Sequence, residues 1–276
     1  MTRNEAVSHI RKTLQEAGLY TENDLNTLFE TATGMKIYDL SSSTLSSEQE
    51  SKIDELLKKR ISGIPLQYIA RYWPFLDFEV KVDERALIPR PETEQLAEKV
   101  KELFGNEAYS NCLDLCSGTG VLAFCLKRFF PSSSVSAVEL SHEACSLMEE
   151  NKSELQLDIR VIEMDAADYL NSCPDCSFDI ITCNPPYITP KDYSDNYDEL
   201  KLEPKMAFIG GEDGLFFYRE LIPIIKEKLK CGHPVAFEIG NDQADPVLTL
   251  LNENGFSNAS VFRDYNNLDR IAVAYA

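Results

Sequence analysis

The spacing of apolar positions changes along the chain, which predicts two kinds of structure. In the first 64 residues, apolar side chains recur every three or four positions, as they do along one face of a helix. Residues 4–18 are predicted to form the first such helix, which should end at Gly18. Its apolar face consists of Val7, Ile10, Leu14 and Ala17.

Further helices follow in the same region. One is predicted over residues 21–34, with Thr21 as its N-cap. The next is expected to begin with a capping box from Ser47 to Glu50. Residues 1–64 are therefore expected to form a small N-terminal helical bundle of three or four helices.

After residue 64 the period of the pattern shortens to two. Residues 65–90 alternate polar positions with apolar, often aromatic ones, so we predict a hairpin linker. From residue 91 the chain alternates helical segments with buried strands such as NCLDLC, VSAVEL and FDIITC. This order is typical of a doubly wound α/β sheet, here with a final strand pair that can include an antiparallel member. Residues 91–276 are expected to form this second domain.

Composition narrows the class of protein. The 276 residues are 43% apolar and 26% charged, and no apolar run approaches the length of a membrane span. The first residues lack the apolar region of a signal peptide, so we expect a cytoplasmic protein without a membrane partner. The net charge is −19, and residues 1–75 carry 9 basic and 10 acidic side chains, so nearly all of the excess lies beyond them. This balance argues against a general nucleic-acid binder.

The eight cysteines are expected to be reduced thiols. Cys173 and Cys176 form the one C-x-x-C pair, and neither a second ligand pair nor a thioredoxin-like setting accompanies it. The three histidines, His9, His142 and His233, fit no metal-ligand spacing. No metal site is predicted.

A glycine-containing turn follows the first strand of the second domain. Gly118 and Gly120 let the backbone turn tightly there, and Glu139 ends the next strand 19 residues after Gly120. A dinucleotide site would have a third glycine, but Ala123 stands in its place. The pattern therefore favours a nucleoside without a pyrophosphate, and S-adenosylmethionine fits, with Glu139 on the ribose and Asp165 near the adenine amino group. A purely structural role for the two glycines remains the alternative.

The segment Asn184-Pro185-Pro186-Tyr187 follows the fourth strand. N-P-P-Y is typical of methyltransferases whose acceptor is a planar NH2 nitrogen, either a base amine or a side-chain amide. The Asn184 side-chain oxygen and the Pro185 carbonyl can each accept one N–H, which would turn the nitrogen lone pair towards the methyl group. Alternatively, the prolines simply end a strand.

The chain resembles, over nearly its whole length, the bacterial release-factor glutamine methyltransferases of the HemK/PrmC type. The resemblance lies in IPRPETE from Ile88 to Glu94, DLCSGTG, NPPY, Glu203-Pro204, GGEDGL from Gly210, FEIG from Phe237 and the terminal DRIAVA. It implies a class I S-adenosylmethionine-dependent methyltransferase fold with a seven-stranded mixed sheet. It also implies methylation of the side-chain amide nitrogen (N5) of the glutamine in the Gly-Gly-Gln motif of peptide chain release factors.

By the same resemblance, roles are assigned to residues. The cofactor would be bound by Asp114, Cys116, Ser117, Gly118, Thr119, Gly120, Glu139, Asp165, Ala166 and Asn184. The substrate glutamine would be held by Asn184, Pro185, Pro186 and Tyr187, of which Asn184, Pro185 and Tyr187 are the expected catalytic residues. Arg90 and Thr93 are expected near the methionine part of the cofactor, although Arg90 can instead anchor the hairpin through an ion pair. Cys116, Ser117 and Ala166 depart from residues common in the family.

The helical bundle would then dock the release factor, and no direct contact with nucleic acid is expected. Two rival functions use the same sequence features. A DNA or RNA adenine or cytosine amino-methyltransferase would share the N-P-P-Y site but needs a basic surface, which the net charge opposes. A cofactor-binding regulator without catalysis would have no use for an amide-binding Asn184.

Overall fold

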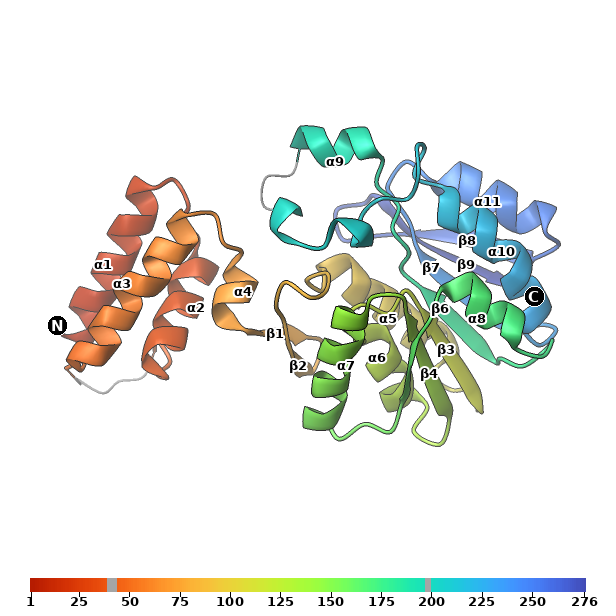
Figure 1. Cartoon of the computed structure of the whole chain (residues 1–276), viewed down its shortest axis with the longest axis horizontal. Helices are drawn as coiled ribbons and strands as arrows, with labels where there is room; N and C mark the ends of the chain where they lie inside the picture. Colours follow the sequence, from red (N-terminus) through yellow and green to blue (C-terminus); the bar gives the residue numbers. More distant parts are fainter. Residues whose placement is uncertain (39–43, 197–199) are drawn as a thin grey trace. The chain divides into compact units, whose positions relative to one another are not determined.

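The computed structural model describes residues 1–38, 44–196 and 200–276. The chain divides into two compact units, Met1–Trp73 and Pro74–Ala276. Figure 1 shows helices in the first unit and a sheet covered by helices in the second. Among the residues described, no helix is both long and apolar enough to cross a membrane.

The first unit contains four helices in the part of the chain that the structure describes. They are α1 (Arg3–Glu16), α2 (Glu22–Thr33), α3 (Ser47–Ile61) and α4 (Leu66–Ala70). Their apolar faces share one core, which includes Ile10, Leu14, Leu28, Phe29, Ile53 and Leu56. Ala6 is buried in α1, whereas Ala17, expected on this face, is exposed.

The ends of these helices follow the polar side chains that cap them. The Thr21 side chain accepts a hydrogen bond from the Asp24 backbone N–H, as expected of an N-cap. The capping box of α3 was expected one residue too late, because Ser46 is the extended residue that precedes the helix. The Ser46 hydroxyl accepts from the Gln49 N–H at 3.2 Å, and the Gln49 side chain accepts from the Ser46 N–H at 3.0 Å.

The expected hairpin over residues 65–90 is shorter than predicted. Its first residues form α4, which buries Leu66 and Ile69 in the helical core and ends at Arg71, whose φ is +68°. Strands β1 (Tyr72–Phe75) and β2 (Phe78–Lys81) make the two-stranded sheet. The helix was missed because its five residues are too few to show a helical period.

The second unit is built on a seven-stranded sheet of order β5-β4-β3-β6-β7-β9-β8. Its strands are β3 (Asn111–Leu115), β4 (Ser134–Glu139), β5 (Arg160–Glu163), β6 (Ile180–Cys183), β7 (Pro234–Glu238), β8 (Ser257–Arg263) and β9 (Asp269–Tyr275). Five are parallel, and β9 pairs antiparallel with both β7 and β8. The doubly wound mixed sheet with an antiparallel final pair is therefore confirmed.

Helices cover both faces of this sheet (Figure 1). One face carries α5 (Pro91–Phe104), α6 (Val121–Phe129) and α7 (His142–Glu154), and the other carries α8 (Ala166–Ser172), α10 (Phe216–Lys228) and α11 (Ala244–Glu253). Between β6 and α10 lie α9 (Pro190–Asn196) and two 3-10 turns, η1 (Leu200–Leu202) and η2 (Lys205–Ala207). Burial of both faces explains why the central strands read as continuous apolar runs.

The register of the parallel strands brings their ends together. Leu115, the last residue of β3, pairs with Val138 of β4 on one side and with Cys183 of β6 on the other. The chain leaves β3 towards β4 and β5 and later returns to β6 on the opposite side, so the strand order reverses between β3 and β6. Ligands of such sheets bind at this reversal, beyond the carboxyl ends of the strands.

Candidate active site

The loop after β3 owes its shape to its two glycines. Gly118 has φ +52°, and a side chain there would meet nothing within 4 Å, so its Cα faces open space. Gly120 has φ +90°, and a Cβ there would lie 2.6 Å from Met148 and 2.7 Å from Phe124. Gly118 therefore leaves room for a ligand, whereas Gly120 lets helix and loop pack closely.

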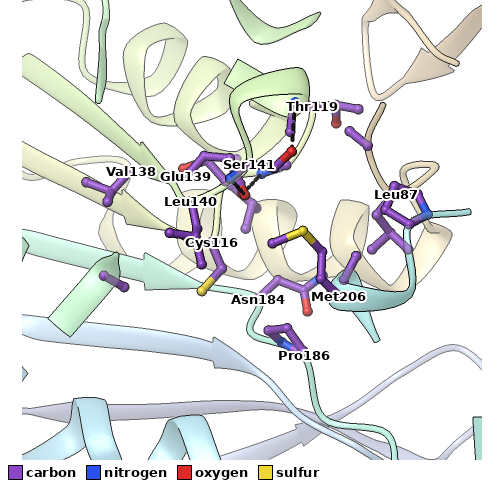
Figure 2. A pocket seen from close by; sticks show the side chains of 18 of the residues that line it. Leu87, Cys116, Thr119, Val138, Glu139, Leu140, Ser141, Asn184, Pro186 and Met206 are labelled. Carbon is purple, nitrogen blue, oxygen red and sulfur yellow. Dashed lines mark hydrogen bonds between the residues drawn. The ribbon is translucent and has the colours of Figure 1, made fainter. Parts of the chain in front are cut away.

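Glu139, at the end of β4, is tied to the same loop. Its Oε2 accepts a 2.9 Å hydrogen bond from the Gly118 N–H, and its Oε1 accepts one of 2.9 Å from the Ser141 N–H. A carboxylate can accept about four hydrogen bonds, so both oxygens retain lone pairs for ligand hydroxyls. Figure 2 shows Glu139 and Ser141 beside Cys116 and Thr119 at the cavity.

A single cavity collects most of the predicted site residues. Its lining includes Cys116, Ser117, Gly118, Thr119, Glu139, Asp165, Ala166, Asn184 and Pro186. Exposed apolar side chains complete the wall: Leu140 is 55% exposed and Met164 is 40% exposed. Two carboxylates, a glycine that leaves space and apolar walls suit a nucleoside, whose hydroxyls and flat base need both kinds of contact.

Asp165 has a structural task in addition to its place in the wall. It is the N-cap of α8, and its Oδ1 accepts hydrogen bonds from the N–H groups of Ala167 at 2.9 Å and Asp168 at 3.1 Å. Ala166 begins that helix and lines the cavity beside it. The cap therefore fixes the carboxylate at the edge of the cavity.

Asp114 does not line the cavity, although it was expected in the cofactor site. It is fully buried in β3, where its Oδ1 accepts a 2.7 Å hydrogen bond from the Thr182 hydroxyl. Burial raises the pKa of Asp114 to about 7, against the opposing effect of hydrogen bonds from Thr182 and Ser117. Gly120 likewise does not line the cavity. Asp114 and Gly120 therefore contribute to the packing around the loop.

The N-P-P-Y segment leaves β6 at the reversal of strand order, and its residues separate. Asn184 and Pro186 line the cavity, Pro185 is buried, and Tyr187 is half-buried against the core of the sheet. Figure 2 places Asn184 and Pro186 opposite Glu139, with Met206 above them. The asparagine and the acidic residue of β4 thus face one space.

A hydrogen-bonded chain lies behind Asn184. The Asn184 amide donates to the Thr93 hydroxyl at 3.2 Å, and Thr93 donates to Glu238 Oε2 at 2.7 Å. The Tyr187 hydroxyl donates to Glu238 Oε1 at 3.1 Å. Burial raises the pKa of the Glu238 carboxyl, while the bonds from Thr93 and Tyr187 oppose the shift. Burial likewise raises the pKa of Tyr187.

The signature segment around Arg90 is anchored by Glu203. The Glu203 carboxylate pairs with the Arg90 guanidinium and accepts a 2.8 Å hydrogen bond from the Ile88 N–H. Arg90 thus makes the anchoring ion pair, and of the two residues expected near the methionine part, Thr93 lines the cavity. Glu203 is buried, so the pair fixes the start of α5, which carries Thr93.

The GGEDGL segment packs against the backbone of N-P-P-Y. A Cβ on Gly210 would lie 2.5 Å from the Pro186 carbonyl oxygen, and one on Gly214 would lie 2.3 Å from that of Tyr187. The Gln243 amide donates to the Tyr187 carbonyl at 3.0 Å. Side chains at the two glycines would push this backbone away from its place.

Other potential metal ligands stay apart. Cys173 is half-buried and Cys176 is exposed. His9 and His142 contact carboxylates, and His233 contacts the Asp179 carbonyl oxygen at 2.9 Å. Across residues 1–38, 44–196 and 200–276, no group of three His, Cys, Asp or Glu side chains is arranged to hold a metal ion.

Several lining residues were not predicted: Leu87, Leu140, Ser141, Met164, Met206 and Phe217. Leu140 and Met164 could have been found from the sequence. Each is an apolar residue that follows an acidic residue at the end of a strand, a position where a polar residue is usual. Met206 lies in the three-residue turn η2 and Phe217 at the start of α10, so no repeating pattern of apolar residues marks either position.

Together, this sheet and a cavity between the ends of β3, β4 and β6 define a class I S-adenosylmethionine-dependent methyltransferase. Residues 92–200 match the methyltransferase small domain, and residues 5–70 match the PrmC N-terminal domain. The chain belongs to the family of release factor glutamine methyltransferases.

Two relatives cover nearly all of both chains. The release factor glutamine methyltransferase of Thermodesulfovibrio yellowstonii is 32% identical over 98% of this chain and 90% of its own length. The release factor glutamine methyltransferase of Caulobacter vibrioides is 30% identical over 99% of this chain and 96% of its own length. A methyltransferase structure from Pyrococcus furiosus shares the fold, with 15% identity and a TM-score of 0.53 over 82% of this chain and 98% of its own.

Proposed function

We propose that this protein transfers a methyl group from S-adenosylmethionine to the side-chain amide nitrogen (N5) of the glutamine in the Gly-Gly-Gln motif of peptide chain release factors. The observation that carries the proposal is the position of Asn184, which faces the cavity that Glu139 also lines. Membership of the release factor glutamine methyltransferase family supports the choice of acceptor.

Glu139 and Asp165 would hold the nucleoside end of the cofactor. The Glu139 oxygens, already oriented by Gly118 and Ser141, would accept hydrogen bonds from the ribose hydroxyls. Leu140 and Met164 would supply apolar contacts to the adenine base. When bound, S-adenosylmethionine supplies a methyl group on a positively charged sulfur, which is a strong electrophile.

An amide is a weak nucleophile because its nitrogen lone pair is delocalised into the carbonyl. We call Asn184 Oδ1 and the Pro185 carbonyl, the two acceptors that would hold the amide, the clamp. The Asn184 Oδ1 and the Pro185 carbonyl would each accept one N–H of the glutamine amide, which turns the lone pair towards the methyl group. As the nitrogen takes the methyl group it releases one proton, and water suffices to accept it because an N-protonated amide is a strong acid. Positioning is then the main contribution of the protein.

The helical unit would dock the body of the release factor. Its described residues expose three large apolar side chains, Tyr38, Ile61 and Tyr72, which would be available to such a contact. The negative charge beyond residue 75 would favour a partner with a basic contact surface. The same charge disfavours direct contact of this protein with nucleic acid.

The test is methyl transfer from labelled S-adenosylmethionine to a purified release factor. A variant of that factor with alanine in place of the Gly-Gly-Gln glutamine serves as the matched control, and DNA and RNA duplexes are tested in parallel. We expect label on the release factor and none on the variant. Label on nucleic acid alone would replace the proposed acceptor with a base amine.

A further inference from the structure

The Thr93 hydroxyl lies between two polar side chains that the sequence places far apart. Its oxygen is 2.7 Å from Glu238 Oε2 and 3.2 Å from the Asn184 amide nitrogen. Thr93 and Glu238 are 4% and 1% exposed, so water does not compete for these bonds. A hydroxyl has one proton, so it can donate to only one of these two neighbours.

The chemistry of the neighbours decides where that proton lies. The Thr93 hydroxyl donates its proton to Glu238 Oε2. The Thr93 oxygen is then left with lone pairs, and it accepts from the NH2 end of the Asn184 amide. The oxygen end of that amide, Oδ1, is therefore the end that remains for a ligand.

The Glu238 carboxyl group is itself fixed by further hydrogen bonds. The Tyr187 hydroxyl donates to its other oxygen at 3.1 Å, and the Tyr218 hydroxyl donates to the Glu238 backbone carbonyl at 2.7 Å. Both carboxylate oxygens thus have a hydroxyl donor, and neither can rotate away without losing one. Hydrogen bonds from neutral groups thus satisfy both oxygens of this buried carboxyl group.

We propose that Thr93 and Glu238 are positioning residues that orient the Asn184 amide for methyl transfer. Without them the amide can turn over, and its NH2 would then face the N–H groups of the acceptor, donor against donor. The inference rests on the proposed function, because it concerns the acceptor amide that Asn184 would hold. It adds two residues that do not themselves have to touch the acceptor.

The first test compares Thr93→Val, which keeps the shape and removes the hydroxyl, with Thr93→Ser, which keeps the hydroxyl. We expect Thr93→Val to lower kcat by on the order of tenfold to a hundredfold, because a misplaced group costs that much. The KM for the release factor and the Kd for S-adenosylmethionine should stay within about threefold of the unaltered protein. Thr93→Ser should recover most of the turnover.

A matched control is Thr249→Val, an exposed threonine of α11 whose hydroxyl bonds only locally to the Asp245 carbonyl. Its kcat should be unchanged. A second comparison uses Glu238→Gln alone and with Thr93→Val. If both act through the Asn184 amide, the double variant should be no slower than the slower single variant. Independent, multiplying losses would overturn the proposed chain, as would full turnover by Thr93→Val.

A measurement without any acceptor separates this inference from the proposed function. In protein labelled with 15N asparagine, the Asn184 side-chain NH2 resonances are assigned by their loss in Asn184→Ala. We expect slow hydrogen exchange at this NH2 in the unaltered protein and in Thr93→Ser, and fast exchange in Thr93→Val. Equal exchange in all three overturns the orienting role, whereas absence of glutamine methylation by the unaltered protein overturns only the acceptor.

Discussion

The Glu139 carboxylate accepts a 2.9 Å hydrogen bond from the Gly118 backbone N–H, 21 residues earlier in the chain. This bond joins the acidic end of β4 to the glycine loop after β3, so the two candidate cofactor-binding features form one rigid unit. Since the Glu139 oxygens are already directed by backbone N–H groups, little reorganisation is needed when a ligand binds.

Removing Glu139 should therefore weaken cofactor binding. Glu139→Ala is expected to cost about 1–3 kcal/mol of binding free energy for S-adenosylmethionine, because a charged acceptor of ribose hydroxyls is lost. Isothermal titration calorimetry measures this directly. Glu149→Ala, on the exposed side of α7, is the control and should bind normally. An unchanged Kd in Glu139→Ala would exclude Glu139 from the cofactor site.

Asn184 should separate binding of the cofactor from turnover. Asn184→Ala is expected to keep the Kd for S-adenosylmethionine within a few-fold and to lower kcat by on the order of a hundredfold, as loss of one positioned polar group does. Single-turnover methylation of a release factor measures the second quantity. Asn252→Ala, exposed on α11, controls for the loss of an amide elsewhere. Near-normal turnover in Asn184→Ala would contradict the clamp.

The sheet and the polar residues at its strand ends could be predicted because both leave local marks in the sequence. Buried parallel strands are short apolar runs, and Gly118, Glu139 and Asn184 lie at the end of such a run or within three residues after it. Parallel strands end at one edge, so position along the chain already implied a common site. A function could be proposed for Asn184 as well, because the four-residue segment N-P-P-Y contains all the groups that the proposed chemistry needs.

Contacts between segments that are far apart in the chain could not be predicted from the sequence. Thr93 and Glu238 are 145 residues apart, and Ile88 and Glu203 are 115 apart, and nothing in the spacing of apolar residues pairs them. The position of Asp114 outside the cavity lining could not be predicted for a related reason, because the sequence of a strand does not say which neighbouring residues a carboxylate on it contacts. The packing of β3 against β6, where Thr182 contacts it, decides this.

Gly210 should be needed for the geometry of N-P-P-Y. A Cβ there would lie 2.5 Å from the Pro186 carbonyl oxygen and 2.7 Å from the Tyr187 Cα, so backbone has to move. Gly210→Ala is expected to lower kcat by about tenfold or more, since small misplacements of reacting groups are costly. Gly232→Ala is the control: its φ of +78° costs stability, but its Cβ meets nothing within 4 Å. Equal kcat losses in both variants would contradict a specific effect.

Asp114 should make stability depend on pH in the direction opposite to most carboxylates. Burial raises its pKa to about 7 in the folded protein, whereas an aspartate in the unfolded chain titrates near ~3.9. Between these values the folded state holds a proton that the unfolded state has lost. The contribution of Asp114 to stability is therefore fully present below about pH 4 and is lost as the pH rises to 7.

Replacing the group removes this dependence. Relative to the unaltered protein, Asp114→Asn is expected to gain stability from pH 4 to pH 7, by a few kcal/mol at roughly 1.4 kcal/mol per pKa unit. Urea unfolding at a series of pH values measures the difference. Asp179→Asn should show the opposite trend, and at lower pH: relative to the unaltered protein it should lose stability as the pH rises to about 4 and then stay level up to pH 7. Although burial raises the pKa of Asp179, the bonds from Lys230 and from the N–H groups of Asn111 and Ser110 prevail and lower it. Parallel pH profiles for the unaltered protein and Asp114→Asn would show that Asp114 is already ionised in the folded state.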